Sequence, residues 1–269
     1  MGALVEDVVA SGVGKIQVWR GGSGDPVVYL HSANGEAAGS VMLEQLADRF
    51  QVVVPMFPGF GESEGIEHIE DIEDAAVHLL DLLDAVGLEA PAVVGTSLGG
   101  WMAAEVASRW PARVSRLVLI NPAGLHIDGA PIKEIFGRDL AELAADLFAD
   151  PSNPVAQLMN QMSALGEKDL AEVPFEVLRP TLQALQATAK VAWNPYLHDP
   201  KLLRRLGKIT APTLVVHGSA DRLIPAVHAA TFVASIPGAR RAEVEGGGHL
   251  VPLEQPSVVA DLIAEHVGR

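Results

Sequence analysis

One stretch near the middle of the chain restricts the possible fold more than any other. The apolar run Ala92–Val94 predicts a buried strand, and the five residues that follow, Gly95–Gly99, form the pattern Gly-x-Ser-x-Gly around Ser97. Apolar residues then recur every four positions from Met102 to Trp110, which predicts one face of a helix. A strand, a sharp turn and a helix would hold the Ser97 hydroxyl exposed at a corner, where glycines permit strained and closely packed backbone. The alternative is a Gly-Ser turn in which Ser97 only caps the helix.

Predicted strands and helices alternate on both sides of this corner. Residues 4–19 favour two antiparallel strands, and the later strands are continuous apolar runs, which are typical of a sheet covered on both faces. The later strands are predicted at 27–30, 52–54, 92–96, 114–120, 212–218 and 241–245, and helices between them at 41–50, 69–86, 98–110, 227–236 and 257–267. We therefore expect an α/β fold with a mostly parallel central sheet and helices on both faces.

The alternation stops between residues 123 and 206. Helices are predicted there at 139–148, 155–165 and 181–193, separated by prolines, and no strand is predicted. We interpret this segment as a helical insertion over the carboxyl edge of the sheet. The expected organisation is a core of residues 1–122 and 207–269 with a helical cap of residues 123–206.

Composition limits the partners of the chain. Lys and Arg number 19 against 34 Asp and Glu, a formal net charge of −15, which disfavours nucleic acids and anionic membrane surfaces. No run reaches the ~18 apolar residues of a membrane span, and the N-terminus lacks a basic region followed by an apolar one. The absence of cysteine excludes disulfides, thiol nucleophiles and thiolate metal sites. We expect a cytoplasmic protein that acts on a small molecule.

The loop after the strand at 52–54 raises the alternative of nucleotide binding. Gly59 and Gly61 form Gly-x-Gly, but the next glycine, Gly65, comes one residue too late for a dinucleotide fingerprint, and Pro58 lies where the turn should be tight. The histidines show no spacing that would gather a metal ion. We therefore expect neither a cofactor nor a metal site.

A serine hydroxyl needs an adjacent base to become a nucleophile, and that base needs an orienting acid. In parallel sheets such groups lie on loops after the carboxyl ends of strands. Two such loops remain downstream of Ser97, and each offers one obvious group: Asp221 after the strand at 212–218, and His249 after the strand at 241–245. The order Ser, Asp, His along the chain is typical of the α/β-hydrolase arrangement.

The chain resembles the α/β-hydrolase family over nearly its whole length. The matching pieces, in order, are the His31 loop, Pro58–Ser63, the Ser97 turn, His217–Asp221 with Pro225, and Gly247–Leu250 with Glu254–Pro256. The resemblance implies that Ser97 is the nucleophile, that His249 is the general base and then the general acid, and that Asp221 orients His249. It also implies that residues 123–206 form the family's cap, which usually lines the substrate pocket.

The resemblance further implies an oxyanion hole of two backbone N–H groups. One is that of Leu98, directly after the nucleophile and at a helix N-terminus, where partial positive charge collects. The family's second donor follows a His-Gly-x pattern, which here reads His31-Ser32-Ala33. By matched position the donor is the amide of Ala33, with Ser32 in place of the usual glycine.

The reaction expected from these groups is acyl transfer to water, with a small neutral carboxylic ester as the first candidate substrate. The alternatives are hydrolysis of a carbon–carbon bond in ring-cleavage products, and a hydrolase fold used as a non-enzymatic ligand receptor. Carbon–carbon hydrolases usually have an aromatic residue after the base, where this chain has Leu250. The expected pocket residues are His31, Met159, Met162, Trp193 and Leu250, and the sequence leaves the oligomeric state open.

Overall fold

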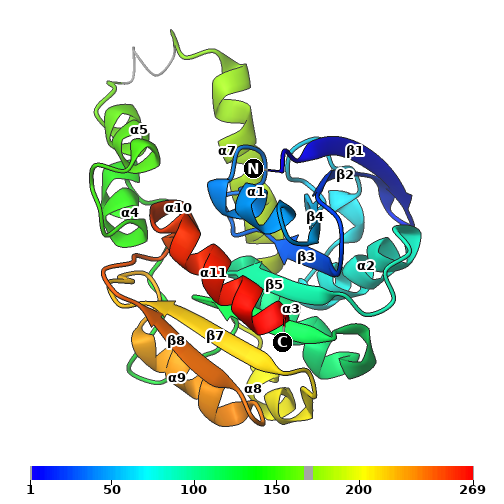
Figure 1. Ribbon diagram of the computed structural model, residues 1–269. Helices are drawn as coiled ribbons and strands as arrows, with labels where there is room; N and C mark the ends of the chain where they lie inside the picture. The colour runs from blue at the N-terminus through cyan, green and yellow to red at the C-terminus, as the bar shows by residue number, and fades with distance from the viewer. Residues whose placement is uncertain (1, 167–171, 269) are drawn as a thin grey trace.

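The computed structural model describes residues 2–166 and 172–268, and a mostly parallel sheet runs through its centre (Figure 1). Within these residues eight strands lie in the order β1-β2-β4-β3-β5-β6-β7-β8. They are β1 (Val5–Ser11), β2 (Gly14–Gly21), β3 (Pro26–Leu30), β4 (Gln51–Pro55), β5 (Ala92–Thr96), β6 (Arg116–Ile120), β7 (Thr213–Gly218) and β8 (Arg240–Val244). β2 pairs antiparallel with β1 and with β4, and all other neighbours are parallel. The predicted α/β fold class is confirmed.

Helices cover both faces of the sheet. They are α1 (Val41–Ala47), α2 (Ile72–Ala85), α3 (Leu98–Arg109), α4 (Leu140–Leu147), α5 (Pro154–Ser163), α7 (Phe175–Ala192), α8 (Leu202–Arg205), α9 (Ala226–Ser235), α10 (Val251–Glu254) and α11 (Pro256–Val267), with single 3₁₀ turns at Ile66–His68, Pro111–Arg113 and Leu206–Lys208. α1 and α11 pack against each other on one face, while α2, α3, α8 and α9 lie on the other (Figure 1).

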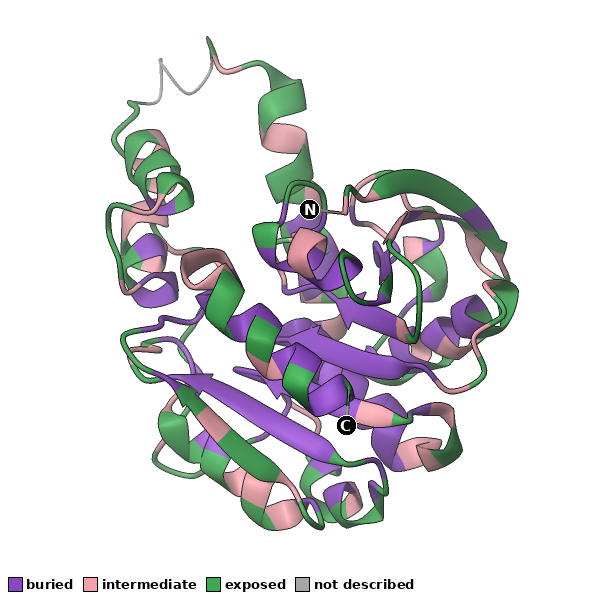
Figure 2. Cartoon of the chain, viewed as in Figure 1, coloured by how far each residue is buried: buried purple, intermediate pink, exposed green. Residues whose placement is uncertain are grey.

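The central strands are buried on both faces, as their continuous apolar sequences predict. Every residue of β5 and of β7 is buried, and so are the last four residues of β3 and of β6 (Figure 2). Side chains of a strand alternate between the two faces, so a strand covered on both sides consists mostly of apolar residues. The carboxyl ends of β3, β5, β6, β7 and β8 therefore emerge together at one edge of a rigid, closely packed core.

In its described residues, the segment between β6 and β7 contributes helices and no strand to the sheet. α4, α5 and α7 project from one end of the molecule (Figure 1), and within the described part of this segment the single β-type contact is a bridge between Gly124 and His198. α7 begins at Phe175, before the predicted start at residue 181, and continues through Pro180. A proline has a helical φ, but inside a helix it removes one N–H donor and its ring crowds the carbonyl four residues earlier, at a cost of about 3 kcal/mol or more.

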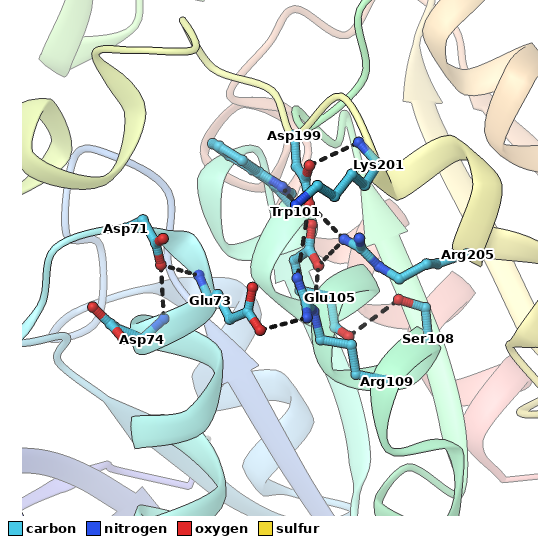
Figure 3. A network of polar contacts seen from close by, with 10 residues as sticks. All are labelled: Asp71, Glu73, Asp74, Trp101, Glu105, Ser108, Arg109, Asp199, Lys201 and Arg205. Atoms are coloured by element: carbon cyan, nitrogen blue, oxygen red, sulfur yellow. Dashed lines mark hydrogen bonds and ion pairs between the residues drawn. The ribbon is translucent and has the colours of Figure 1, made fainter.

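A buried carboxylate anchors α3, the helix that follows the Gly-x-Ser-x-Gly turn (Figure 3). Glu105 accepts hydrogen bonds from Trp101 Nε1 at 3.1 Å and Arg109 Nε at 3.0 Å, and it pairs with Arg205 on α8. Burial raises the pKa of the Glu105 carboxyl, and the contacts with Arg109 and Arg205 oppose that rise. Because a buried carboxylate is costly without such partners, they fix α3 against α8.

None of the helices in residues 2–166 and 172–268 combines the length and the apolar character that crossing a membrane requires.

Candidate active site

Ser97 lies between β5 and α3 in a backbone conformation that non-glycine residues rarely adopt. Its φ is +54° and its ψ is −111°, and the side chain is largely buried, with 8% of the residue exposed. The flanking glycines are required by space, because a Cβ on Gly99 would collide with the carbonyl oxygen of Leu30, and one on Gly95 with that of Gly99. The strain is held by the packed strand and helix on either side, as is common where a side chain must be presented for chemistry.

The structure brings Ser97, His249 and Asp221 together from three separate loops. His249 Nε2 lies 2.9 Å from Ser97 Oγ, and His249 Nδ1 lies 2.8 Å from Asp221 Oδ2. A carboxylate can only accept, so Nδ1 carries the imidazole proton and Nε2 presents its lone pair to the serine hydroxyl. A hydroxyl, an imidazole and a carboxylate in this order can transfer the serine proton to the imidazole as the oxygen attacks an electrophile.

Asp221 is held as firmly as the imidazole it contacts. Its Oδ1 accepts hydrogen bonds from the backbone N–H of Leu223 at 2.8 Å and of Ile224 at 2.9 Å, which leaves Oδ2 for His249. The Asp221 side chain is 0% exposed and that of His249 is 2% exposed. The carboxylate therefore closes its own loop and orients the imidazole at the same time.

Asn121, which follows β6, ties the Asp221 and His249 loops together. Its Nδ2 donates to the carbonyls of Gly248 at 3.1 Å and His249 at 2.8 Å, and its Oδ1 accepts from Gly218 N–H at 3.0 Å and from His217 Nδ1 at 3.1 Å. Burial lowers the pKa of His217, which keeps that imidazole neutral beside the amide. Asn121 is not among the residues predicted from sequence; the available signal was a polar residue directly after a buried strand, at the edge where the loops meet.

Glu254 supports the His249 loop from the other side. Its Oε2 accepts from Gly248 N–H at 2.6 Å, and its Oε1 accepts from the N–H groups of Ala149 and Asp150 at 2.7 and 2.8 Å. A Cβ on Gly248 would lie 2.6 Å from Ala149 N and 2.7 Å from Glu254 Oε2, so this glycine is required by its neighbours. Glu254 thereby joins the loop that carries the imidazole to the chain that leaves α4.

Two residues with backbone amides that are unpaired in the described structure line the same cavity as Ser97. In the loop after β3, Asn34 N–H donates to Ser32 Oγ and Gly35 N–H donates to the Ser32 carbonyl, both at 3.1 Å, while Ser32 N–H is bonded to a carboxylate. Within the described chain, the N–H groups of Ala33 and Leu98 have no hydrogen-bond partner, and both residues line the cavity. Two free donors beside a hydroxyl can stabilise negative charge that develops on a substrate oxygen.

The cavity at Ser97 has an aliphatic wall. Leu143 and Leu147 of α4 and Leu185 of α7 line it together with polar residues. In the part of the chain that the structure describes, its lining is Ser32, Ala33, Asn34, Ser97, Leu98, Ile135, Leu143, Leu147, Leu185, Leu197, Leu223, Ile224, His249 and Leu250. Among the described residues, the lining includes no aromatic side chain and, apart from His249, no basic one. An uncharged aliphatic group is the chemistry that such a wall accommodates.

The residues expected in the pocket from sequence divide into two groups. Leu250 lines the cavity, whereas the other four do not. His31 is buried beneath it, where its Nε2 accepts from Phe57 N–H at 3.1 Å and burial lowers its pKa. Met159 and Met162 belong to α5, which packs against α4, and it is α4 whose leucines reach the cavity. Trp193 is 61% exposed and its ring packs on Phe136 instead.

Comparison with known proteins identifies the family. A family model described as the alpha/beta hydrolase fold matches residues 25–256. The chain belongs to the alpha/beta hydrolase fold family. The resemblance expected from the sequence pieces is thus confirmed.

Curated relatives of this chain carry names that refer to different activities. Polyketide synthase ThaQ of Burkholderia thailandensis is 32% identical over 97% of this chain and 13% of its own length. The dihydrolipoyllysine-residue acetyltransferase component of the acetoin cleaving system of Cupriavidus necator is 27% identical over 93% of this chain and 65% of its own length. The chain thus spans less than two thirds of both proteins. A 2-hydroxy-6-oxo-6-phenylhexa-2,4-dienoate hydrolase of Burkholderia cepacia is 27% identical over 84% of this chain and 82% of its own length.

Solved structures agree on the fold. The 2-hydroxy-6-oxo-6-phenylhexa-2,4-dienoate hydrolase of Rhodococcus sp. strain RHA1 superposes with a TM-score of 0.78 at 23% identity, covering 100% of both chains. At this identity the similarity establishes a shared architecture for this alpha/beta hydrolase and leaves its substrate to be argued from the site.

Proposed function

We propose that this protein is a serine hydrolase that cleaves a small neutral carboxylic ester through an acyl-enzyme. The observation that carries the proposal is the 2.9 Å contact between His249 Nε2 and Ser97 Oγ, with Asp221 Oδ2 behind the imidazole at 2.8 Å. A serine hydroxyl alone is a weak nucleophile, and this arrangement supplies the base that it lacks.

In the proposed mechanism Ser97 Oγ attacks the ester carbonyl while His249 Nε2 accepts the hydroxyl proton. The oxygen of the tetrahedral intermediate becomes negatively charged and accepts hydrogen bonds from Leu98 and Ala33 N–H. The intermediate collapses as His249 donates the proton to the leaving alcohol, and the acyl group stays on Oγ. Water then repeats the attack with the same base, which releases the acid and restores the serine.

We further propose that residues 123–206 act as a cap that selects the substrate. Ile135, Leu143, Leu147, Leu185 and Leu197 from this segment all face the cavity. Their side chains favour an aliphatic group by excluding water from it, at about 0.8 kcal/mol per buried CH₂. Rates should therefore rise with acyl chain length over the first few carbons.

A second candidate is hydrolysis of a carbon–carbon bond, favoured by the name of the Burkholderia cepacia relative, a 2-hydroxy-6-oxo-6-phenylhexa-2,4-dienoate hydrolase. Such a substrate has a carboxylate and, in that name, a phenyl group. The described lining of this cavity has no basic side chain except His249 and no aromatic one, which favours the neutral ester instead.

The test is steady-state turnover of p-nitrophenyl acetate, butyrate and hexanoate, with ring-opened phenylhexadienoate as the competing substrate. Ser97→Ala should lower kcat by roughly 10⁴-fold or more. Ser115→Ala is the matched control, because Ser115 is an exposed serine before β6. A serine-reactive phosphonate should label Ser97 in the parent protein.

Three outcomes would contradict the proposal in different ways. Equal ester turnover by Ser97→Ala and the parent would reject Ser97 as the nucleophile. Preferred cleavage of the dienoate would reject the ester. Tight binding of an ester with neither turnover nor labelling would indicate a receptor built on a hydrolase fold.

A further inference from the structure

Glu36, which neither the resemblance nor the proposed mechanism uses, lies at the centre of the hydrogen bonds that shape the loop after β3. Its Oε1 accepts from Ser32 N–H at 2.8 Å, and its Oε2 accepts from Ser32 Oγ at 2.6 Å. The carboxylate thus holds both the backbone and the side chain of the residue before Ala33. A glycine in place of Ser32 would lack the second contact.

The same carboxylate reaches the strand that leads to Ser97. Glu36 Oε1 also accepts from the hydroxyl of Tyr29, at 2.9 Å, and that hydroxyl lies 2.9 Å from Thr96 Oγ1. Tyr29 has one hydroxyl proton and gives it to the carboxylate, so Thr96 is the donor in the second bond. The hydrogen-bonded chain Thr96–Tyr29–Glu36–Ser32 therefore links the residue before Ser97 to the residue before Ala33; its other members are buried, and Glu36 is partly exposed.

These contacts determine which amide of the loop stays free. Ser32 N–H is bonded by Glu36, and Ser32 Oγ, itself oriented by Glu36, accepts from Asn34 N–H at 3.1 Å. The carbonyl of Ser32 accepts from Gly35 N–H at 3.1 Å. Of the amides from 32 to 35, that of Ala33 alone has no partner among the described residues, and it lines the cavity beside Leu98.

We propose that Glu36 is a positioning residue for the oxyanion hole, acting through Ser32 on the Ala33 amide and through Tyr29 and Thr96 on the Ser97 turn. The inference rests on the proposed function, because an oxyanion must form for the positioning to matter. Oxyanion donors contribute only if they are aimed in advance at the charge that develops. The hydrogen-bonded chain fixes the two donor-bearing loops relative to each other before substrate binds.

The expected effect is on kcat rather than on KM. Removal of one oxyanion donor lowers kcat by about 10²–10³-fold, and Glu36→Ala should misdirect the donor without deleting it, so we expect a loss of roughly 10- to 100-fold. KM for p-nitrophenyl butyrate should change by less than about threefold, because a ground-state carbonyl gains little from these donors.

An alkyl boronic acid gives a second readout that a purely structural role would not affect. Boron accepts the Ser97 oxygen and becomes tetrahedral, so one boronate oxygen occupies the oxyanion position. Its inhibition constant should weaken with Glu36→Ala by the same factor as kcat, as expected for a transition-state analogue. The thermal midpoint, measured in parallel, separates loss of folding from loss of positioning.

Two further variants keep the test decisive. Glu36→Gln retains an oxygen for Ser32 N–H and Tyr29 and offers an N–H to Ser32 Oγ, so it should restore kcat to within about threefold of the parent. Ser32→Ala keeps the Ser32 N–H contact and loses both Oγ contacts, so kcat should fall by about 3- to 10-fold even if Glu36→Ala does not fold. Glu44→Ala is the matched control, a half-buried glutamate of α1 whose side chain makes no hydrogen bond to Ser32, Glu36 or Tyr29 among the described residues.

The results distinguish this inference from the proposed function. If Ser97→Ala is inactive and Glu36→Ala has the parent's kcat and boronate affinity, the positioning role is rejected and the hydrolase stands. If Glu36→Gln loses as much as Glu36→Ala, the charge matters rather than the position, which also rejects it. If the parent neither hydrolyses esters nor reacts with the phosphonate, both fall together.

Discussion

Asn121→Ala is the sharpest test of how the site is held together. The substitution removes four buried hydrogen bonds, two that Nδ2 donates to the Gly248 and His249 carbonyls and two that Oδ1 accepts from Gly218 N–H and His217 Nδ1. At about 1 kcal/mol for each net hydrogen bond, the free energy of unfolding should fall by about 4 kcal/mol. For a chain of this length that corresponds to a drop of about 8 °C or more in Tm.

The same change should reduce activity, because the backbone of His249 loses its tether. A misplacement of about 1 Å in a catalytic group can lower a rate by ~10²-fold, and we expect kcat to fall between about 10- and 100-fold. Asn121→Asp separates the two halves of the interaction. Its carboxylate keeps the acceptor for Gly218 and His217 and turns a second oxygen toward two carbonyls, which costs at least the two donated bonds, about 2 kcal/mol.

Urea unfolding followed by circular dichroism measures the first quantity, and p-nitrophenyl butyrate turnover measures the second. Asn160→Ala is the control, because Asn160 is exposed on α5 and should change stability by no more than about 0.5 kcal/mol. A free energy of unfolding for Asn121→Ala within about 1 kcal/mol of the parent's, with the same dependence on urea, would refute this reasoning. The four hydrogen bonds would then contribute much less stability than about 4 kcal/mol.

The remaining predictions concern the backbone of the Gly-x-Ser-x-Gly turn and a buried histidine. Gly99→Ala should lower the free energy of unfolding by about 3 kcal/mol or more, because its Cβ would collide with the rigid Leu30 carbonyl. Gly207→Ala is the control, because there is open space around its Cβ. Equal thermal midpoints for the two variants would contradict the prediction. Burial lowers the pKa of His78, against the opposing charge of Asp81, and neither ring nitrogen has a hydrogen-bond partner among the described residues. The unfolded chain therefore binds this proton near pH 6.5 and the folded chain only at lower pH, so stability falls as pH decreases below about 6.5, by up to about 1.4 kcal/mol per pH unit. His78→Leu should flatten that slope in urea titrations from pH 7 to 5, and an unchanged slope would show that His78 does not contribute to it.

Much of the fold was predictable because burial on both faces leaves a simple pattern in sequence. β3, β5 and β7 are continuous apolar runs, and their ends locate the loops that carry Ser97 and Asp221. Such patterns are local, and they say where a strand ends. They also predict that loops at the carboxyl edge of a parallel sheet meet, which is how His249 could be paired with Ser97 across 152 positions.

The supports of the site could not be predicted in the same way. Asn121 Nδ2 donates to the carbonyl of a residue 128 positions away. Every residue has a backbone carbonyl, so the sequence does not indicate which one will accept this hydrogen bond. The residues of the cavity wall could not be predicted for another reason. Helical spacing shows that Met159 and Met162 share a face of a helix, but the direction of that face depends on how α5 packs against α4. Leu143 and Leu147 of α4 are also at helical spacing, and they line the cavity.

The position of Glu254 has a consequence for engineering this molecule. Its carboxylate holds Gly248 with one oxygen and the amides of Ala149 and Asp150 with the other, and Leu250 N–H donates to the Leu147 carbonyl at 3.0 Å. The residues that follow α4 are therefore hydrogen-bonded to the loop that bears the imidazole of His249. A chimera in which the helices over the cavity are replaced by those of another protein would have to keep these hydrogen bonds. If the grafted segment displaced residues 147–150, it would also move His249, so a change intended for substrate specificity would disturb the catalytic base.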